Sequence, residues 1–172
     1  GQSETAVHGM TDFFLLLMLS GAGDELQGIK KGIMEMADMI VINKADGDNV
    51  RQSELARRQY ENALHLFPPS DSGWTPVAGT ASALKNIGIT EVWEKIQEFK
   101  KLVDQNGYFL KNRQEQQIQW MYNNIHEELK QLFYGTDQIA ERLKTLEREV
   151  VDARLSPVKA AEIIIEAFKK SI

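Results

Sequence analysis

Short apolar runs alternate with helix-like patterns along the first 106 residues. Residues 13–19 and 39–42 are continuous apolar runs, which is typical of parallel strands that helices bury on both faces. A third, short strand is expected over 75–80. Apolar residues at three- and four-residue spacing predict helices over 26–37, 50–67 and 89–103. The alternation predicts an α/β fold with a parallel sheet and crossover helices, and ligands bind such sheets beyond the carboxyl ends of the strands.

The strands stop near residue 106, and residues 107–172 carry three further helix patterns. Their apolar stripes consist of Ile118, Met121, Ile125, Leu129 and Leu132, of Ile139, Leu143, Leu146 and Val150, and of Val158, Ala161, Ile164, Ile165, Phe168 and Ile172. Ser156 is the predicted N-cap of the last helix, with Pro157 at its first helical position. Because these stripes need a surface to cover them, we expect an all-α extension that packs on the first part or on a second copy of the chain.

Composition and charge exclude several classes of partner. The formal net charge is −5, and the 20 Lys and Arg residues are scattered rather than gathered in a basic stripe, so neither nucleic acid nor a membrane surface is an expected partner. The longest apolar run, 13–19, is far shorter than the roughly 20 residues that cross a bilayer. The sequence has no cysteine, and His8, His65 and His126 lie far apart, so no metal site is expected within this chain. This composition is compatible with a cytoplasmic location.

Polar residues of three kinds follow the apolar run 39–42. Asn43, Lys44 and Asp46 have the spacing Asn-Lys-x-Asp, which is the guanine-selecting motif of GTP-binding proteins. Guanine carries two adjacent donors, N1–H and N2–H₂, and one carboxylate can accept from both. Asp46 is the candidate reader of the base, Lys44 the residue whose stem lies along it, and Asn43 a link between neighbouring loops. The structural alternative is an ordinary turn in which Asp46 or Asp48 caps a helix.

A second segment has the position that a guanine site requires. Ser82, Ala83 and Leu84 follow the third predicted strand, where the corresponding tripeptide of GTPases offers a backbone N–H to guanine O6. The alternative is a turn of small residues. The glycine-rich stretch 21–32 is a third candidate, although Asp24 with Gln27 three residues later is also a plain helix-capping pair.

The sequence has no G-x-x-x-x-G-K-[ST] phosphate loop. Without that loop and its metal, phosphoryl transfer lacks electrostatic support, so we expect no effective GTP hydrolysis by this chain alone. If the nucleotide interpretation holds, the phosphate half of the site is expected to precede Gly1.

Three segments carry a family resemblance: residues 1–7, 12–49 and 82–96. They resemble the MeaB/ArgK GTPases, which are associated with methylmalonyl-CoA mutase and were formerly labelled LAO/AO transport system ATPases. The resemblance extends over essentially the whole chain, and the stretch 21–32 separates this family from other GTPases. Ser20 departs from the proline that relatives commonly have at this position.

The resemblance implies the C-terminal half of a P-loop G domain over residues 1–106 and an α-helical homodimerisation extension over 107–172. It implies GTP and GDP binding, hydrolysis with Mg²⁺, and a chaperone role for adenosylcobalamin-dependent methylmalonyl-CoA mutase. The nucleotide-binding residues it implies are Asn43, Lys44, Asp46, Ser82, Ala83 and Leu84. The switch residues it implies are Gln2, Ser3, Glu4, Asp24 and Lys30.

Two other functions fit parts of the sequence. The chain could be a non-catalytic module that dimerises through its helices and retains vestigial nucleotide motifs. The sequence upstream of Gly1 separates the two, because a phosphate loop about one domain's length earlier favours the GTPase. A kinase for a transport protein, as the older family label suggests, requires a His-Arg-Asp-type catalytic loop, which the sequence lacks.

Overall fold

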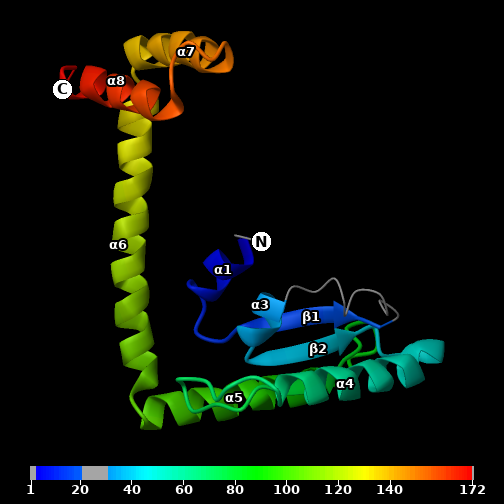
Figure 1. Ribbon diagram of the computed structural model, residues 1–172. Coiled ribbons are helices and arrows are strands. Elements are labelled where there is room, and N and C mark those ends of the chain that lie inside the picture. Colours follow the sequence, from blue (N-terminus) through cyan, green and yellow to red (C-terminus); the bar gives the residue numbers. More distant parts are fainter. Residues whose placement is uncertain (1–2, 21–30, 172) are drawn as a thin grey trace. The chain divides into compact units, whose positions relative to one another are not determined.

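The computed structural model describes residues 3–20 and 31–171, which form two compact units, Gly1–Gln116 and Gln117–Ile172 (Figure 1). The elements of the first unit are α1 (Ser3–His8), β1 (Leu15–Leu19), α3 (Lys31–Glu35), β2 (Met39–Asn43), the 3-10 helix η1 (Gly47–Asn49), α4 (Val50–Leu64), β3 (Val77–Thr80) and α5 (Ile89–Gln105). Helix α6 (Tyr108–Tyr134) contains the boundary between the units, and α7 (Asp137–Val151) and α8 (Pro157–Lys169) belong to the second.

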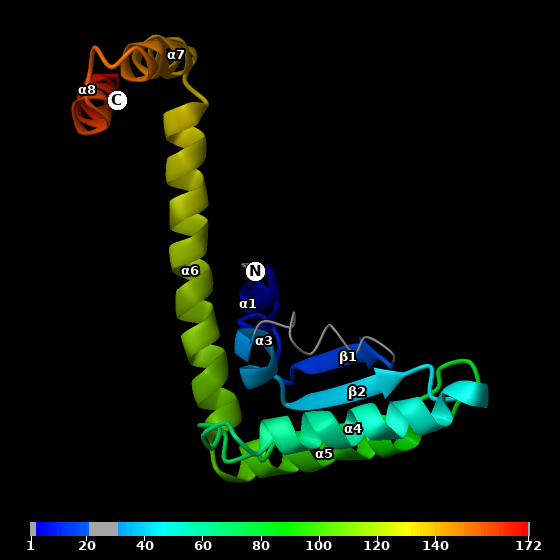
Figure 2. The same ribbon diagram turned by 45° about the vertical axis from the view of Figure 1, so that its right-hand side comes forward.

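The three strands of the described residues form one parallel sheet in the order β1-β2-β3, which confirms the predicted α/β fold class. The register pairs Leu17 with Val41, and Val41 with Gly79. Figure 2 shows the arrowheads of β1 and β2 at the end of the sheet where the chain enters α4. The carboxyl ends of the strands therefore share one edge, and the polar residues that follow them meet there.

Strand β2 is the middle strand of the sheet, and both of its faces are apolar. Ile40 and Ile42 are fully buried and belong to a core cluster with Tyr60 and Leu64 of α4. On the other face, Met39 and Val41 pack with Val92 of α5 and with Ala81. A strand with apolar side chains on both faces is stable only between two covering layers.

The prediction that 13–19 is a fully buried strand is wrong for the described part of the chain. The strand begins at Leu15, and the Leu17 and Leu19 side chains are 60% and 50% exposed. Among the residues that the structure describes, β1 pairs only with β2, so it is an edge strand. Periodicity reports the apolar character of a strand but not how many neighbours the strand has.

The second unit has its own small core. Ile139 and Leu146 of α7 pack with Ala160 and Ile164 of α8. The predicted cap is confirmed, since Ser156 Oγ accepts from the Lys159 backbone N–H at 3.2 Å and Pro157 begins α8. Within the described ranges, no helix combines the length and the apolar content that a membrane span needs.

The apolar stripe of α6 is exposed in this unit. Its members, each 45–58% exposed, are Ile118, Met121, Ile125, Leu129 and Leu132. A monomer rarely exposes a continuous apolar row of this kind without a partner for it.

Candidate functional site

Two loops meet at the carboxyl edge of the sheet, one after β2 and one after β3. The Ala81 N–H donates to the Ile42 carbonyl at 2.9 Å, and the Ala45 N–H donates to the Ala81 carbonyl at 3.0 Å. Ala81 is buried, so these main-chain bonds lie inside the protein. They hold the Asn-Lys-Ala-Asp segment against the segment that contains Ser82.

Asn43 connects the two loops through its side chain. Its Oδ1 accepts from the Lys44 N–H at 2.8 Å and from the Ala83 N–H at 3.4 Å. The second contact joins residues 40 positions apart in sequence. An amide at the last residue of β2 thereby fixes the start of both loops.

Asp46 and Ser82 form the centre of the site. Ser82 is fully buried, and its Oγ donates to Asp46 Oδ2 and accepts from the Lys85 N–H at 3.1 Å. Asp46 stands at the N-cap position of η1, but its side chain makes no capping hydrogen bond. The carboxylate is held by the neighbouring loop, which contradicts the helix-cap alternative for Asp46.

Lys44 has an uncommon backbone conformation for a residue with a side chain. Its φ is +60°, in the left-handed region, and its carbonyl accepts from Asn49 Nδ2 at 2.8 Å. Such a conformation costs on the order of 1–3 kcal/mol and persists only where surrounding contacts impose it. The Lys44 side chain is exposed.

A tight turn closes the second loop. Ser82 and Ile87 exchange two main-chain hydrogen bonds of 2.8 and 3.1 Å. Gly88 follows with a φ of +75°, and a Cβ at this position would lie 2.3 Å from the Thr80 carbonyl oxygen. Only glycine allows the chain to pass this close to the end of β3.

The structure brings together Asn43, Asp46, Ser82 and Ala83, whereas Leu84 is 82% exposed at the outer side of its loop. Residue spacing gave no role to Asn49, which holds the Lys44 carbonyl. Its amide is one of many that follow strands, and no sequence signal distinguishes it.

The structure describes only two of the five residues expected to act as switches. Ser3 and Glu4 lie in α1. Gln2, Asp24 and Lys30 lie outside the described residues.

The arrangement is suited to binding a group that carries neighbouring donors. Asp46 Oδ2 is taken by Ser82, while no described residue donates to Oδ1. In the second loop, the Ala83 N–H bonds to Asn43 Oδ1 and the Lys85 N–H to Ser82 Oγ, while the Leu84 N–H has no acceptor among the described residues. No group of three or more metal-ligating side chains occurs in the part of the chain that the structure covers.

Comparisons with known proteins agree on one family. The model of the "Methylmalonyl Co-A mutase-associated GTPase MeaB" family matches residues 1–138. The mouse protein "Methylmalonic aciduria type A homolog, mitochondrial" is 41% identical over 98% of this chain and 41% of its own length. GTPase ArgK of Escherichia coli K12 is 46% identical over 80% of this chain and 42% of its own length.

One solved structure matches nearly the whole chain. It is described as the crystal structure of an LAO/AO transport system kinase, with a TM-score of 0.78 and 36% identity over 98% of this chain and 54% of that one. The chain thus spans about half of the length of the relatives that it matches.

Proposed function

Since the chain belongs to the MeaB family of methylmalonyl Co-A mutase-associated GTPases, we propose that its sheet edge binds the guanine base of GTP and GDP. The observation that carries this proposal is the position of Asp46, which the hydroxyl of the buried Ser82 holds beside the loop that starts at Ala83. Asp46 accepts the N1–H and N2–H₂ of guanine, and the backbone N–H of Leu84 donates to the O6, while the Ala83 N–H bonds to Asn43 Oδ1.

The proposed site selects guanine because a bound adenine leaves the hydrogen-bonding groups of the site unpaired. Adenine has no N–H at N1 and no amino group at C2, so a carboxylate at Asp46 faces an acceptor instead of two donors. A site that hydrogen-bonds particular N–H groups of a ligand rejects analogues without those groups by roughly 10⁴-fold. Asn43 contributes indirectly, by fixing both loops, and the Lys44 stem covers the base.

The activity proposed for the whole protein extends beyond this chain. We infer that GTP is hydrolysed with Mg²⁺ on a phosphate-binding part outside these residues, and that the protein acts as a chaperone for adenosylcobalamin-dependent methylmalonyl-CoA mutase in the cytoplasm. The name of the matching family supports the mutase as partner. The relatives named as GTPases support the hydrolysis.

The substitution Asp46→Asn in the full-length protein tests the base-reading role. Displacement of a fluorescent GTP analogue by GTP, ATP and XTP reports the selectivity. We expect GTP to bind at least tenfold more weakly, because the amide replaces one acceptor with a donor. XTP should gain affinity, since xanthine has a carbonyl at C2 that the new amide can donate to.

Asp48→Asn is the matched control, because Asp48 is an exposed carboxylate two residues away. This variant should keep the nucleotide preference of the wild type. Unchanged GTP-over-ATP selectivity in Asp46→Asn refutes the base-reading role and leaves the non-catalytic helical module as the better interpretation.

We also propose that the helical extension mediates homodimerisation. The support is the exposed apolar stripe of α6, together with an apolar groove of about 720 Å³ in the second unit, which is lined by Leu129, Phe133, Ile165 and Phe168 among others. A second copy of the same helices is the simplest surface to cover the stripe.

A further inference from the structure

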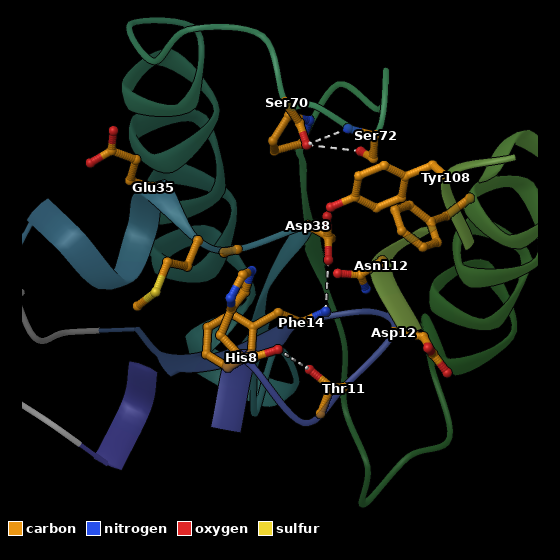
Figure 3. Close-up of a pocket in the computed structure, with 14 residues that line it drawn as sticks. His8, Thr11, Asp12, Phe14, Glu35, Asp38, Ser70, Ser72, Tyr108 and Asn112 are labelled. Atoms are coloured by element: carbon orange, nitrogen blue, oxygen red, sulfur yellow. Dashed lines mark hydrogen bonds between the residues drawn. The ribbon is translucent and has the colours of Figure 1, made fainter. Parts of the chain in front are cut away.

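A cavity of about 160 Å³ lies at the amino ends of the strands, at the opposite edge of the sheet from Asp46. Phe14, Asp38 and Pro76, which precede β1, β2 and β3, line it. Figure 3 shows Asp38 between His8 of α1 and Tyr108 of α6, with Asn112 beside it. The proposed nucleotide site uses none of these residues.

Asp38 is a largely buried carboxyl group that has no cationic partner in the part of the chain that the structure describes. Its Oδ2 accepts from the Phe14 N–H at 2.7 Å, and its main-chain carbonyl accepts from Trp74 Nε1 at 2.9 Å. Burial raises the pKa of Asp38 to about 6, and the hydrogen bond from Phe14 opposes that rise. Among the described residues, none forms an ion pair with it. A buried carboxylate is stable only when a cation or enough donors compensate for its lost hydration.

The lining of the cavity contains three acidic residues, Asp12, Glu35 and Asp38. Asp12, which lines the cavity, is paired with Arg113, and no lysine or arginine is among the described lining residues. Burial raises the pKa of Tyr108, and the charges of Asp38, Asp71 and Glu115 add to the rise. The pKa of His8 is lowered by burial, which favours its neutral form. In the described ranges, the Tyr108 hydroxyl and the Asn112 amide have no hydrogen-bond partner.

The cavity also has an apolar wall that a small organic group can contact. Phe14, Met36, Pro76 and Phe99 supply it. The volume is close to that of an engineered cavity of ~150 Å³ that holds one benzene molecule. A bare metal ion fits poorly, since no group of three metal-ligating side chains occurs in the described part of the chain.

We propose that this cavity binds a small primary alkylamine, whose ammonium group pairs with Asp38 and whose alkyl stem lies against Phe14 and Phe99. The Tyr108 hydroxyl oxygen and the Asn112 carbonyl oxygen accept the other ammonium N–H groups. The ligand supplies a cation to a carboxylate that pairs with none among the described residues, and the aromatic rings give its stem an apolar contact.

Titration of the full-length protein with n-butylammonium chloride tests this proposal. The Trp74 indole N–H is the reporter in ¹H–¹⁵N spectra because it bonds to the Asp38 carbonyl, and Trp74→Phe assigns its signal. We expect a saturable shift at pH 7.5. In Asp38→Asn the affinity should fall at least about tenfold, the effect of removing one charge-assisted hydrogen bond. Asparagine keeps an acceptor for the Phe14 N–H, so this variant should fold.

Three comparisons complete the experiment. Glu94→Gln, the same chemical change at an exposed position of α5, should bind the amine like the wild type. Tyr108→Phe, which removes a single hydroxyl, should weaken binding about threefold. n-Butanol has the same stem without the charge and should give no saturable shift. Equal amine binding by wild type and Asp38→Asn, or equal binding of butanol and butylammonium, overturns the proposal. Loss of GTP selectivity does not bear on it, because the two sites share no residue.

Discussion

A single hydroxyl group, on Ser82, joins the two loops of the candidate site. It donates to Asp46 and accepts from the Lys85 N–H, and it is fully buried. A buried hydroxyl that uses its donor and an acceptor position fixes both partners, since either one left unpaired costs about 1–3 kcal/mol. Ser82 therefore holds the Asp46 carboxylate in place more firmly than a surface contact does.

Gly88 allows a test of how closely the second loop must approach β3. Gly88→Ala places a methyl group against the Thr80 carbonyl, at 2.3 Å, in a backbone conformation with positive φ. We expect the free energy of unfolding, measured with urea, to fall by roughly 2–4 kcal/mol. Gly107→Ala is the matched control, because Gly107 also has a positive φ but no atom within 4 Å of its added Cβ. The control should lose only about 1 kcal/mol, and equal losses would show that the close approach is unimportant.

Asp38 predicts an unusual dependence of stability on pH. Its pKa is about 6 in the folded protein against 3.8 ordinarily, so the folded state holds the proton more tightly. The protonation of Asp38 therefore adds to the free energy of unfolding at low pH, and this contribution is lost as the pH rises from about 4 through 6. The full difference corresponds to roughly 3 kcal/mol at 1.36 kcal/mol per pH unit.

The variant Asp38→Asn isolates this effect from that of His8. At pH 7.5 the variant should be about 1–3 kcal/mol more stable than the wild type in urea unfolding, because it buries no charge. The difference should vanish near pH 4. Glu94→Gln should show no such trend, and a constant difference between pH 4 and 7.5 contradicts the assignment.

At the scale of elements, two similar apolar runs have different surroundings. Strand β2 is buried on both faces, while two residues of β1 are at least half exposed. The difference comes from strand order, since β2 has a hydrogen-bonded neighbour on each side and β1 pairs only with β2 among the described residues. An exposed edge of this kind is open to pairing with a further strand.

Helix α6 carries the prediction about self-association. Replacing Ile125 and Leu129 together with Asp puts two charges on the exposed stripe, where an apolar interface cannot pair them. We expect the full-length protein to change from dimer to monomer in light scattering. Gln131→Glu, on the opposite side of the same helix, should leave the dimer intact. A wild-type protein that is already monomeric ends the proposal.

At the scale of the whole molecule, the chain combines a sheet-based unit with a helical one. The matched relatives are about twice as long as this chain. One solved structure matches nearly all of the chain with a TM-score of 0.78. The sequence order of the guanine motifs, with Asn43 to Asp46 first and Ser82 to Leu84 next, predicted a guanine-nucleotide site, and the resemblance of residues 1–7, 12–49 and 82–96 predicted the family. Asp38 gave a weaker signal, as a carboxylate directly before an apolar strand, and its role was not anticipated.

Local pattern determined the strands, the helices, the cap at Ser156 and the order of the polar segments, because each depends on residues close together in sequence. Tertiary structure alone decided that β1 pairs only with β2 among the described residues and that Asp46 bonds to Ser82, 36 residues away, instead of capping η1. It also decided that Asp38 meets Phe14 from 24 residues away at the rim of a cavity. Contacts across such separations follow from strand order and register, which a one-dimensional pattern does not specify.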